Sequence, residues 1–161
     1  MLPISRILVP YDWGEMSNRA FQLAASLALK NDAELVVLFV VPLPAVMYGP
    51  PDESYLKHMR EQLGRVKPSD PTTRVKYQLA EGNPATEILR VAKETKCELI
   101  VIGTHGRTGL NRFVLGSVAE DVIRMAPCLV LTMTGEVPGN PLGEPQCLQA
   151  STKSNLVSIG P

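Results

Sequence analysis

The stretch from Ile100 to Arg124 constrains the fold more than any other part of the chain. An apolar strand over 98–102 breaks at Gly103, a glycine-rich loop follows (GTHGRTG), and regular structure resumes at Gly116 and Ser117. A strand, glycine loop and helix in this order let backbone N–H groups and a helix N-terminus converge on an anion. The alternative is that the glycines only make a turn. Three glycines and a serine around one strand end favour the anion site.

The glycines of this loop have a physical use at a binding site. Without a Cβ, Gly103, Gly106 and Gly116 let the backbone approach a ligand closely. We expect Ser117 to be the N-cap of the following helix, and Glu120 three residues later completes a capping box. The loop is therefore predicted to lead directly into a helix N-terminus.

Two charged or titratable side chains lie inside the loop. His105 is either a proton shuttle or a solvated spacer, and Arg107 either neutralises phosphate charge or is an ordinary surface arginine. Ile102 and Val118 flank the loop and complete this part of the candidate binding set. The residue types alone leave both alternatives open.

Strands and helices alternate along the rest of the chain. Apolar or alternating runs predict strands over 4–11, 33–41, 74–80, 98–102 and 128–133. Helical spacing of apolar residues predicts a helix after each of the first four strands, with Asp52, Asn83 and Ser117 as N-caps of the last three. This order indicates a single α/β domain with a parallel sheet covered by helices on both faces.

The first predicted helix shows which residues we expect to face the core. Ala20, Leu23, Ala24 and Leu27 recur at helical spacing, so they form the expected buried stripe. Ser17 is expected to point elsewhere. In the last helix, the residues expected to point inward are Val118, Val122 and Met125.

Length and charge limit the classes of function. The chain has 161 residues, enough for one domain over 1–134 followed by a flexible tail over 135–161 that is rich in Gly, Pro, Ser, Asn and Gln. Formal net charge is +0 and no long run of one sign occurs, which argues against nucleic acid or an anionic membrane as the main partner. No apolar run reaches the roughly 18 residues that a membrane span needs, and the N-terminus shows no cleavable signal pattern.

The cysteines favour a reducing compartment. Cys97, Cys128 and Cys147 are odd in number and widely spaced, which fits the cytoplasm better than a disulfide framework. Cys97 and Cys128 border apolar strands, where packing as small hydrophobic side chains is favoured over redox or metal chemistry.

Four separated motifs together resemble one protein family. The spacing Gly103-x2-Gly106-x9-Gly116-Ser117 is similar to the G-x2-G-x9-G-[ST] pattern of the nucleotide-binding branch of the universal stress protein family. In the same way, 7–12 (ILVPYD) resembles the first strand of that family, 81–84 (EGNP) a strand-to-helix corner, and 127–131 (PCLVL) the last strand. The resemblance covers about residues 4–134 and implies a Rossmann-like open five-stranded parallel sheet in the order 3-2-1-4-5.

This strand order places a binding crevice. Ligands of open parallel sheets bind beyond the carboxyl ends of the strands where the order reverses, here between the first and fourth strands. Asp12 and Gly103 end those strands and should face each other. Asp12 is thus a candidate for ribose hydroxyls or for a Mg²⁺ ion held on phosphates. Pro10 and Val40 would supply an apolar wall.

The resemblance also implies individual contacts to a nucleotide. The backbone of Val40 would read the adenine edge. Backbone N–H groups at Gly106, Gly116 and Ser117, with the Ser117 hydroxyl, would hold the phosphates. The chain departs from the family at Trp13 and Gly14, where a small residue followed by serine is frequent.

These observations lead to three hypotheses of function. The leading one is a cytoplasmic, ATP-binding regulator or sensor of the stress response, with an unknown protein partner and no assigned catalytic residue. It forms a homodimer through the apolar edge strand 128–133, which no helix follows. The second is a weak Mg²⁺-dependent ATPase or phosphotransferase that uses Asp12. The third is an interaction module without nucleotide, in which the glycine loop is only a turn.

Overall fold

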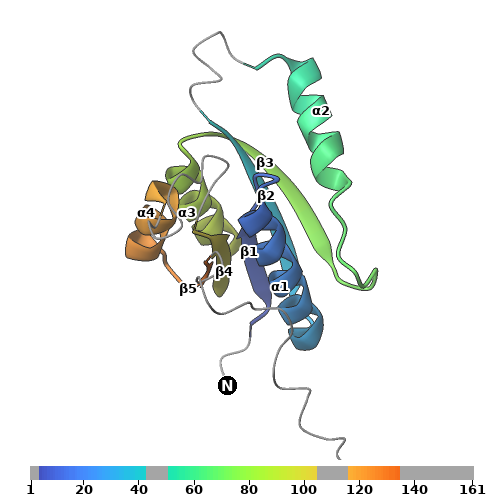
Figure 1. Cartoon of the computed structure of the whole chain (residues 1–161), viewed down its shortest axis with the longest axis vertical. Helices are drawn as coiled ribbons and strands as arrows, with labels where there is room; N and C mark the ends of the chain where they lie inside the picture. Colours follow the sequence, from blue (N-terminus) through green and yellow to red (C-terminus); the bar gives the residue numbers. More distant parts are fainter. Residues whose placement is uncertain (1–3, 43–50, 105–115, 135–161) are drawn as a thin grey trace, which may run out of the picture.

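Five parallel strands alternate with four helices in the part of the chain that the computed structural model describes, residues 4–42, 51–104 and 116–134 (Figure 1). The elements are β1 Arg6–Pro10, α1 Glu15–Asn31, β2 Glu34–Pro42, α2 Glu53–Gly64, β3 Val75–Gly82, α3 Pro84–Thr95, β4 Leu99–Gly103, α4 Ser117–Met125 and β5 Leu129–Met133. This alternation confirms the predicted α/β class. The tail predicted over 135–161 lies outside the described residues. Among the described helices, none is long and apolar enough to cross a bilayer.

The sheet has the strand order β3-β2-β1-β4-β5, and all of its pairs are parallel. Two apolar cores lie on its two faces: one packs α1 and α2 against the sheet, and the other packs α3 and α4. Successive residues of β1 alternate between them, with Ile7 and Val9 in the first core and Leu8 in the second. The order predicted from the family resemblance and the cover on both faces are thus confirmed.

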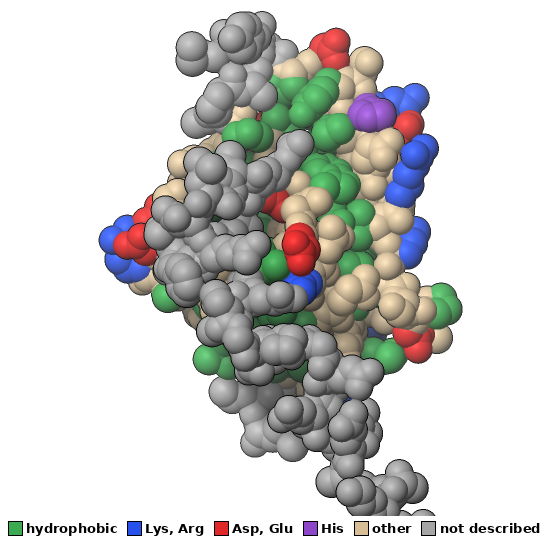
Figure 2. Space-filling model, in the orientation of Figure 1, with side chains coloured by type: hydrophobic (Ala, Val, Ile, Leu, Met, Phe, Trp, Pro, Cys, Tyr) green, Lys and Arg blue, Asp and Glu red, His purple; other side chains and the backbone are tan. Residues whose placement is uncertain are grey.

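The α1/α2 side of the molecule contains a groove. A groove of about 280 Å³ lies between α1 and the segment 68–73, lined by residues such as Ala25, Leu29 and Pro68. In the space-filling view, hydrophobic side chains remain visible in a band down this side of the molecule (Figure 2). This groove is separate from the carboxyl edge of the sheet, where the candidate site lies.

Two of the predicted helix starts are confirmed in atomic detail. The Asp52 carboxylate accepts a hydrogen bond from the Tyr55 N–H at 2.7 Å, and the Asn83 side chain accepts one from the Thr86 N–H at 3.1 Å. Pro84 occupies the first turn of α3, where a missing N–H has no cost. Both caps depend on short-range geometry, which is why the sequence pattern predicts them well.

The buried stripes of α1 and α4 differ from the predictions. In α1, Ser17 is buried, whereas Leu23 and Leu27 only flank the core. The reason is that the buried stripe of α1 is centred on the alanines at 20, 24 and 28, so the leucines lie at its border. In α4, Ala119 and Val122 are buried, whereas Met125 is 53% exposed.

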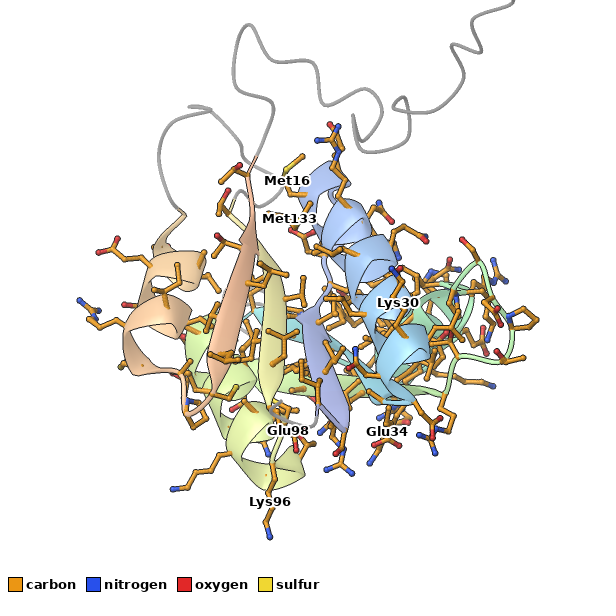
Figure 3. The ribbon with its side chains drawn as sticks, turned by 90° about the horizontal axis from the view of Figure 1, so that it is seen from below. Met16, Lys30, Glu34, Lys96, Glu98 and Met133 are labelled. Atoms are coloured by element: carbon orange, nitrogen blue, oxygen red, sulfur yellow. The ribbon has the colours of Figure 1, made fainter. Side chains whose placement is uncertain are left out.

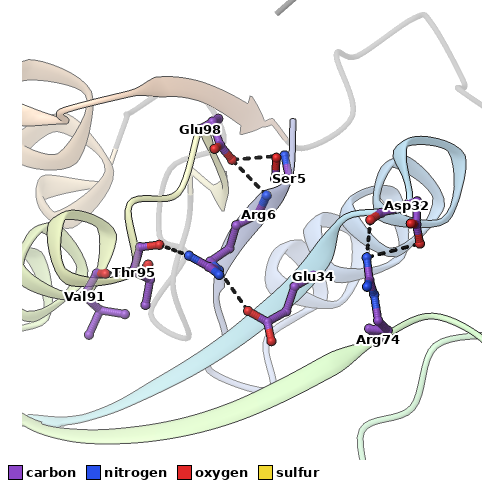
Figure 4. A network of polar contacts seen from close by, with 8 residues as sticks. All are labelled: Ser5, Arg6, Asp32, Glu34, Arg74, Val91, Thr95 and Glu98. Atoms are coloured by element: carbon purple, nitrogen blue, oxygen red, sulfur yellow. Dashed lines mark hydrogen bonds and ion pairs between the residues drawn. The ribbon is translucent and has the colours of Figure 1, made fainter. Parts of the chain in front are cut away.

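Polar contacts tie the strands together at the amino end of the sheet (Figure 4). One oxygen of the Glu98 carboxylate accepts the N–H of Arg6 at 2.8 Å and the N–H of Ser5 at 3.1 Å, which joins β1 to the start of β4. The Arg6 guanidinium donates to Glu34 at 2.8 Å and to the Thr95 carbonyl, joining β2 and the end of α3. Figure 3 shows Glu34 and Glu98 at this end of the sheet, opposite Met16 and Met133.

We predict that Glu98→Ala destabilises the protein by about 1–2 kcal/mol, because two backbone N–H groups lose a charged acceptor. Thermal unfolding should show a Tm about 3–6 °C lower. Glu94→Ala is the matched control, since Glu94 makes an exposed ion pair with Arg90 within α3, and pairs of this kind contribute little. An equal fall in Tm for both variants would contradict the role given to Glu98.

Candidate functional site

The sheet opens between β1 and β4 at its carboxyl end. The ladder between these strands is limited to Ile7↔Leu99 and Leu8↔Ile100. The neighbouring ladders run on, β1–β2 to Pro10↔Leu38 and β4–β5 to Gly103↔Met133. The two central strands therefore separate over their last residues, at the point where the strand order reverses. Pro10 and Asp12 lie on one side of this opening, and Ile102 and Gly103 on the other.

The backbone of Val40 is directed toward this opening. The Leu38 carbonyl accepts the Tyr11 N–H at 2.8 Å, so the polar groups of Leu38 face β1. In a parallel strand the backbone groups of alternate residues face the same neighbour, and those of Val40 therefore also point to the β1 side. The ladder between β1 and β2 ends at Pro10↔Leu38, before it reaches Val40. Its N–H and C=O consequently lie at the rim of the opening, past the end of β1.

Asp12 is held by a compact turn at the end of β1. Its Oδ1 accepts the Gly14 N–H at 2.8 Å and the Ser17 hydroxyl at 2.6 Å. The Ser17 hydroxyl oxygen in turn accepts the Asp12 N–H at 3.3 Å. These bonds engage Oδ1 and leave Oδ2 as the oxygen for a ligand. Ser17 is a site residue that the sequence analysis missed, although a serine five residues after a strand-end aspartate was the available signal.

The departure from the family pattern at Trp13 and Gly14 has a structural consequence. Trp13 adopts a left-handed backbone conformation with φ of 62°, and its indole meets the rings of Tyr11 and Phe39 edge-on at centroid distances of 5.7 and 4.5 Å. A Cβ at Gly14 would lie 2.8 Å from the Asp12 Oδ1. Glycine at 14 therefore permits the turn, and the aromatic contacts fix it against the α1/α2 core.

Gly103 is required by packing as well as by any ligand. A Cβ built there would lie 2.7 Å from the Met16 Cβ and 3.2 Å from the Ser17 backbone nitrogen. The first turn of α1 thus rests directly on the end of β4, near the Met16 side chain labelled in Figure 3. The closeness of these backbones sets the distance between the Asp12 turn and β4.

We predict that Gly103→Ala costs about 1–3 kcal/mol of stability, because the new methyl group pushes α1 off β4. Chemical denaturation with the midpoint followed by circular dichroism measures the loss. Gly64→Ala serves as the control, since nothing lies within 4 Å of the place that a Cβ would take there and alanine favours the helix by up to about 1 kcal/mol. If Gly103→Ala keeps full stability, the glycine is reserved for ligand approach alone.

Thr104 joins the ends of three elements. Its N–H and hydroxyl donate to the Met133 carbonyl at 2.9 and 3.1 Å, and its own carbonyl accepts the Gly116 N–H at 2.7 Å. The ends of β4 and β5 and the start of α4 therefore meet at one buried threonine. The two flanks of the glycine-rich loop are thereby brought together next to Gly103.

The start of α4 differs from the predicted capping box. Gly116 is the N-cap and Ser117 the first helical residue, and no side chain caps this end. A Cβ at Gly116 would lie 2.8 Å from the Thr104 carbonyl, so the residue at this position must be small. The Gly116 N–H already has the Thr104 carbonyl as its acceptor. The first-turn N–H groups of Ser117 and Val118 and the exposed Ser117 hydroxyl are the groups left for an anion.

The remaining predicted loop residues, His105, Gly106 and Arg107, lie outside the described residues. Within the described ranges, no group of three or more His, Cys, Asp or Glu side chains is arranged to hold a metal ion. Asp12 alone fits the role of one carboxylate ligand to a Mg²⁺ ion whose other ligands are phosphate oxygens and water, which is the usual arrangement for that ion.

Comparison with known proteins places this chain in a family. A sequence model described as the Universal stress protein family matches residues 3–133. Universal stress protein MJ0531 of Methanocaldococcus jannaschii is 38% identical over 137 residues, which are 80% of this chain and 81% of that protein. The structure of universal stress protein UspA from Lactobacillus plantarum is similar with a TM-score of 0.68 and 27% identity, over 83% of this chain and 99% of the other.

Two further structures share the fold and contain an adenine nucleotide. A universal stress protein in complex with cAMP matches 82% of this chain and 98% of its own, with a TM-score of 0.57 and 22% identity. A universal stress protein from Archaeoglobus fulgidus in complex with dAMP gives a TM-score of 0.59 and 21% identity over the same shares. At this identity the likeness establishes a common fold.

Proposed function

Because the chain belongs to the universal stress protein family, we propose that it binds ATP in the opening between β1 and β4 and acts as a dimeric regulator or sensor in the stress response. The observation that carries the proposal is the early end of the β1–β4 ladder, which leaves the Val40 backbone and the Asp12 carboxylate at one opening. Two proteins of the same fold whose structures contain cAMP or dAMP support an adenine nucleotide as the ligand. The proposed setting is the cytoplasm.

Each part of the nucleotide has a matching group. The N–H and C=O of Val40 suit the hydrogen-bonding edge of adenine, with Pro10 as part of the apolar wall. The Asp12 Oδ2 accepts ribose hydroxyls or holds Mg²⁺ on the phosphates. The Ser117 N–H and hydroxyl and the Val118 N–H meet the phosphates at the positive end of the α4 dipole. Gly106 and Arg107 belong to the same proposed phosphate segment by their sequence position.

Binding rather than rapid turnover fits the Asp12 geometry. A general base must be placed to take a proton from the attacking water. The Asp12 carboxylate is instead fixed by the Gly14 N–H and the Ser17 hydroxyl, which suits ligand orientation. The second candidate, a weak Mg²⁺-dependent ATPase, would require hydrolysis that Asp12→Asn abolishes.

We predict that Ser117→Pro weakens ATP binding about 10- to 100-fold, because the variant removes one N–H and one hydroxyl from the phosphate site. The helix should tolerate the change. Proline is favoured at the first helical position, and the φ of −65° and ψ of 145° at Gly116 suit a residue that precedes proline. Isothermal titration with ATP in the presence of Mg²⁺ measures the effect.

Adenosine is the internal control for this experiment. It lacks phosphates, so its affinity for Ser117→Pro should equal that for the unmodified protein. Weakening of both ligands alike would indicate a folding defect. Unchanged ATP binding by a folded variant would remove α4 from the site, and failure of the unmodified protein to bind ATP would leave the interaction module as the remaining hypothesis.

The edge strand β5 suits the proposed homodimer. Among the described strands, β5 pairs with β4 alone, and Leu129 and Leu131 are 56% and 38% exposed. An exposed apolar edge strand is a natural surface for pairing with a two-fold copy. Val130 packs on the α3/α4 core instead, so the leucines are the residues to test.

We predict that Leu131→Asp converts a dimer into a monomer, because two carboxylates would meet across the two-fold axis. Light scattering coupled to size-exclusion chromatography reads the mass directly. Leu29→Asp is the matched control, since Leu29 is similarly exposed, at 45%, but lies on α1. A monomeric unmodified protein, or a Leu131→Asp variant that stays dimeric, would contradict assembly through β5.

A further inference from the structure

Two free thiols lie in contact at the amino end of the sheet. The sulfur atoms of Cys97 and Cys128 are 3.7 Å apart, although 31 positions separate the residues in the sequence. Cys97 precedes β4 and Cys128 precedes β5, which are neighbouring parallel strands with Leu99 opposite Leu129. The contact therefore results from strand register.

The backbone on both sides of this pair is well fixed. Cys97 follows the left-handed C-cap Lys96 of α3, and its N–H donates to the Ala92 carbonyl at 3.1 Å. One residue past Cys128, the Leu129 N–H donates to the Glu98 carbonyl at 3.3 Å. A disulfide needs the sulfurs at about 2.05 Å, so side-chain rotation must bring them about 1.6 Å closer without a change of strand register.

We propose that Cys97 and Cys128 are a redox modification site, at which a hydroperoxide forms an intramolecular disulfide. The Cys128 sulfur first attacks the O–O bond of hydrogen peroxide, which gives a sulfenic acid and one water. The Cys97 sulfur then attacks the Cys128 sulfur, so that the S–S bond forms, the S–O bond breaks and a second water leaves. The two thiols together lose two electrons and two protons, and the peroxide is reduced to two waters.

Exposure assigns the order of these steps. Cys97 is only 5% exposed, whereas Cys128 is half-buried and so is the sulfur that an oxidant reaches first. Burial raises the pKa of the Cys97 thiol to about 12 and also raises the pKa of Cys128. Because the thiolate is the reactive form, oxidation should be slow at neutral pH and should accelerate as the pH rises. The pair should therefore form a disulfide during long exposure to an oxidant and stay reduced during a brief one.

The disulfide would stabilise the edge of the sheet. It ties the start of β5, the outermost strand, to the start of β4, and it closes the segment that carries both β4 and α4. Closing a segment of about 30 residues restricts the unfolded chain and should raise the Tm by about 5–10 °C. A dithiol reductant reverses the change.

The test is oxidation of the full-length protein by hydrogen peroxide, followed by alkylation of the remaining thiols and peptide mass mapping. We expect a peptide pair joined through Cys97 and Cys128, a higher Tm, restoration of the original Tm by dithiothreitol, and faster formation at higher pH. Cys128→Ser should abolish the rise in Tm, and Cys97→Ala should do the same. Cys147→Ser, which leaves the pair intact, should behave like the unmodified protein.

Three results would overturn the proposal. They are a disulfide between two chains, a disulfide that includes Cys147, and oxidation of Cys128 to a sulfinic acid with Cys97 still reduced. A disulfide between Cys97 and Cys128 without any rise in Tm would contradict the stabilisation of the edge strand. Because Cys128 is half-buried, the Cys128→Ser variant should fold more readily than a variant at the buried Cys97. The test therefore does not depend on the folding of the Cys97 variant.

Discussion

The need to bury β1 on both faces governs the rest of the structure. Its residues Ile7, Leu8 and Val9 are fully buried and divide between two cores, so both layers of helices depend on this one strand. Because β1 is short, the chain leaves the sheet at Tyr11 while β2 continues to Pro42. The opening at the carboxyl edge arises because β1 and β4 separate after the pair Leu8↔Ile100, before either strand ends. The binding groups proposed for the nucleotide are those left at the rim.

A second constraint acts on the other side of the opening. Thr104 joins the ends of β4 and β5 and the start of α4 through its backbone groups and its hydroxyl, so the N-terminus of α4 is held beside Gly103. A helix dipole is useful to an anion only within the first turn. Placement by Thr104 thus determines whether α4 can serve the site, and the hydroxyl of Ser117 adds a donor only because this placement exists.

The comparison of sequence and structure shows where local signals suffice. The strands, the helix caps Asp52 and Asn83, and the α/β class follow from short-range patterns, whereas the strand order followed from the family resemblance. The predicted N-cap of α4 was wrong by one residue. The cap is Gly116, whose N–H donates to the Thr104 carbonyl, a contact that forms only in the folded chain. Burial of Ser17 was missed for a similar reason, since its partner is the Asp12 turn. Gly103 and Gly116 were assigned to ligand approach, yet both also fill places where protein atoms leave no room for a Cβ.

The two ends of the sheet differ in how they are joined, and this difference bears on how such a protein can diverge. At the amino end, Glu98 and Arg6 cross-connect β1, β2, β4 and α3 through charged side chains (Figure 4). At the carboxyl end, β4, β5 and the start of α4 are joined mainly by backbone hydrogen bonds, whose formation does not depend on side-chain identity. Loops at that end can therefore accumulate substitutions while the strand register is preserved from the opposite end. One edge maintains the scaffold, and recognition is free to evolve at the other.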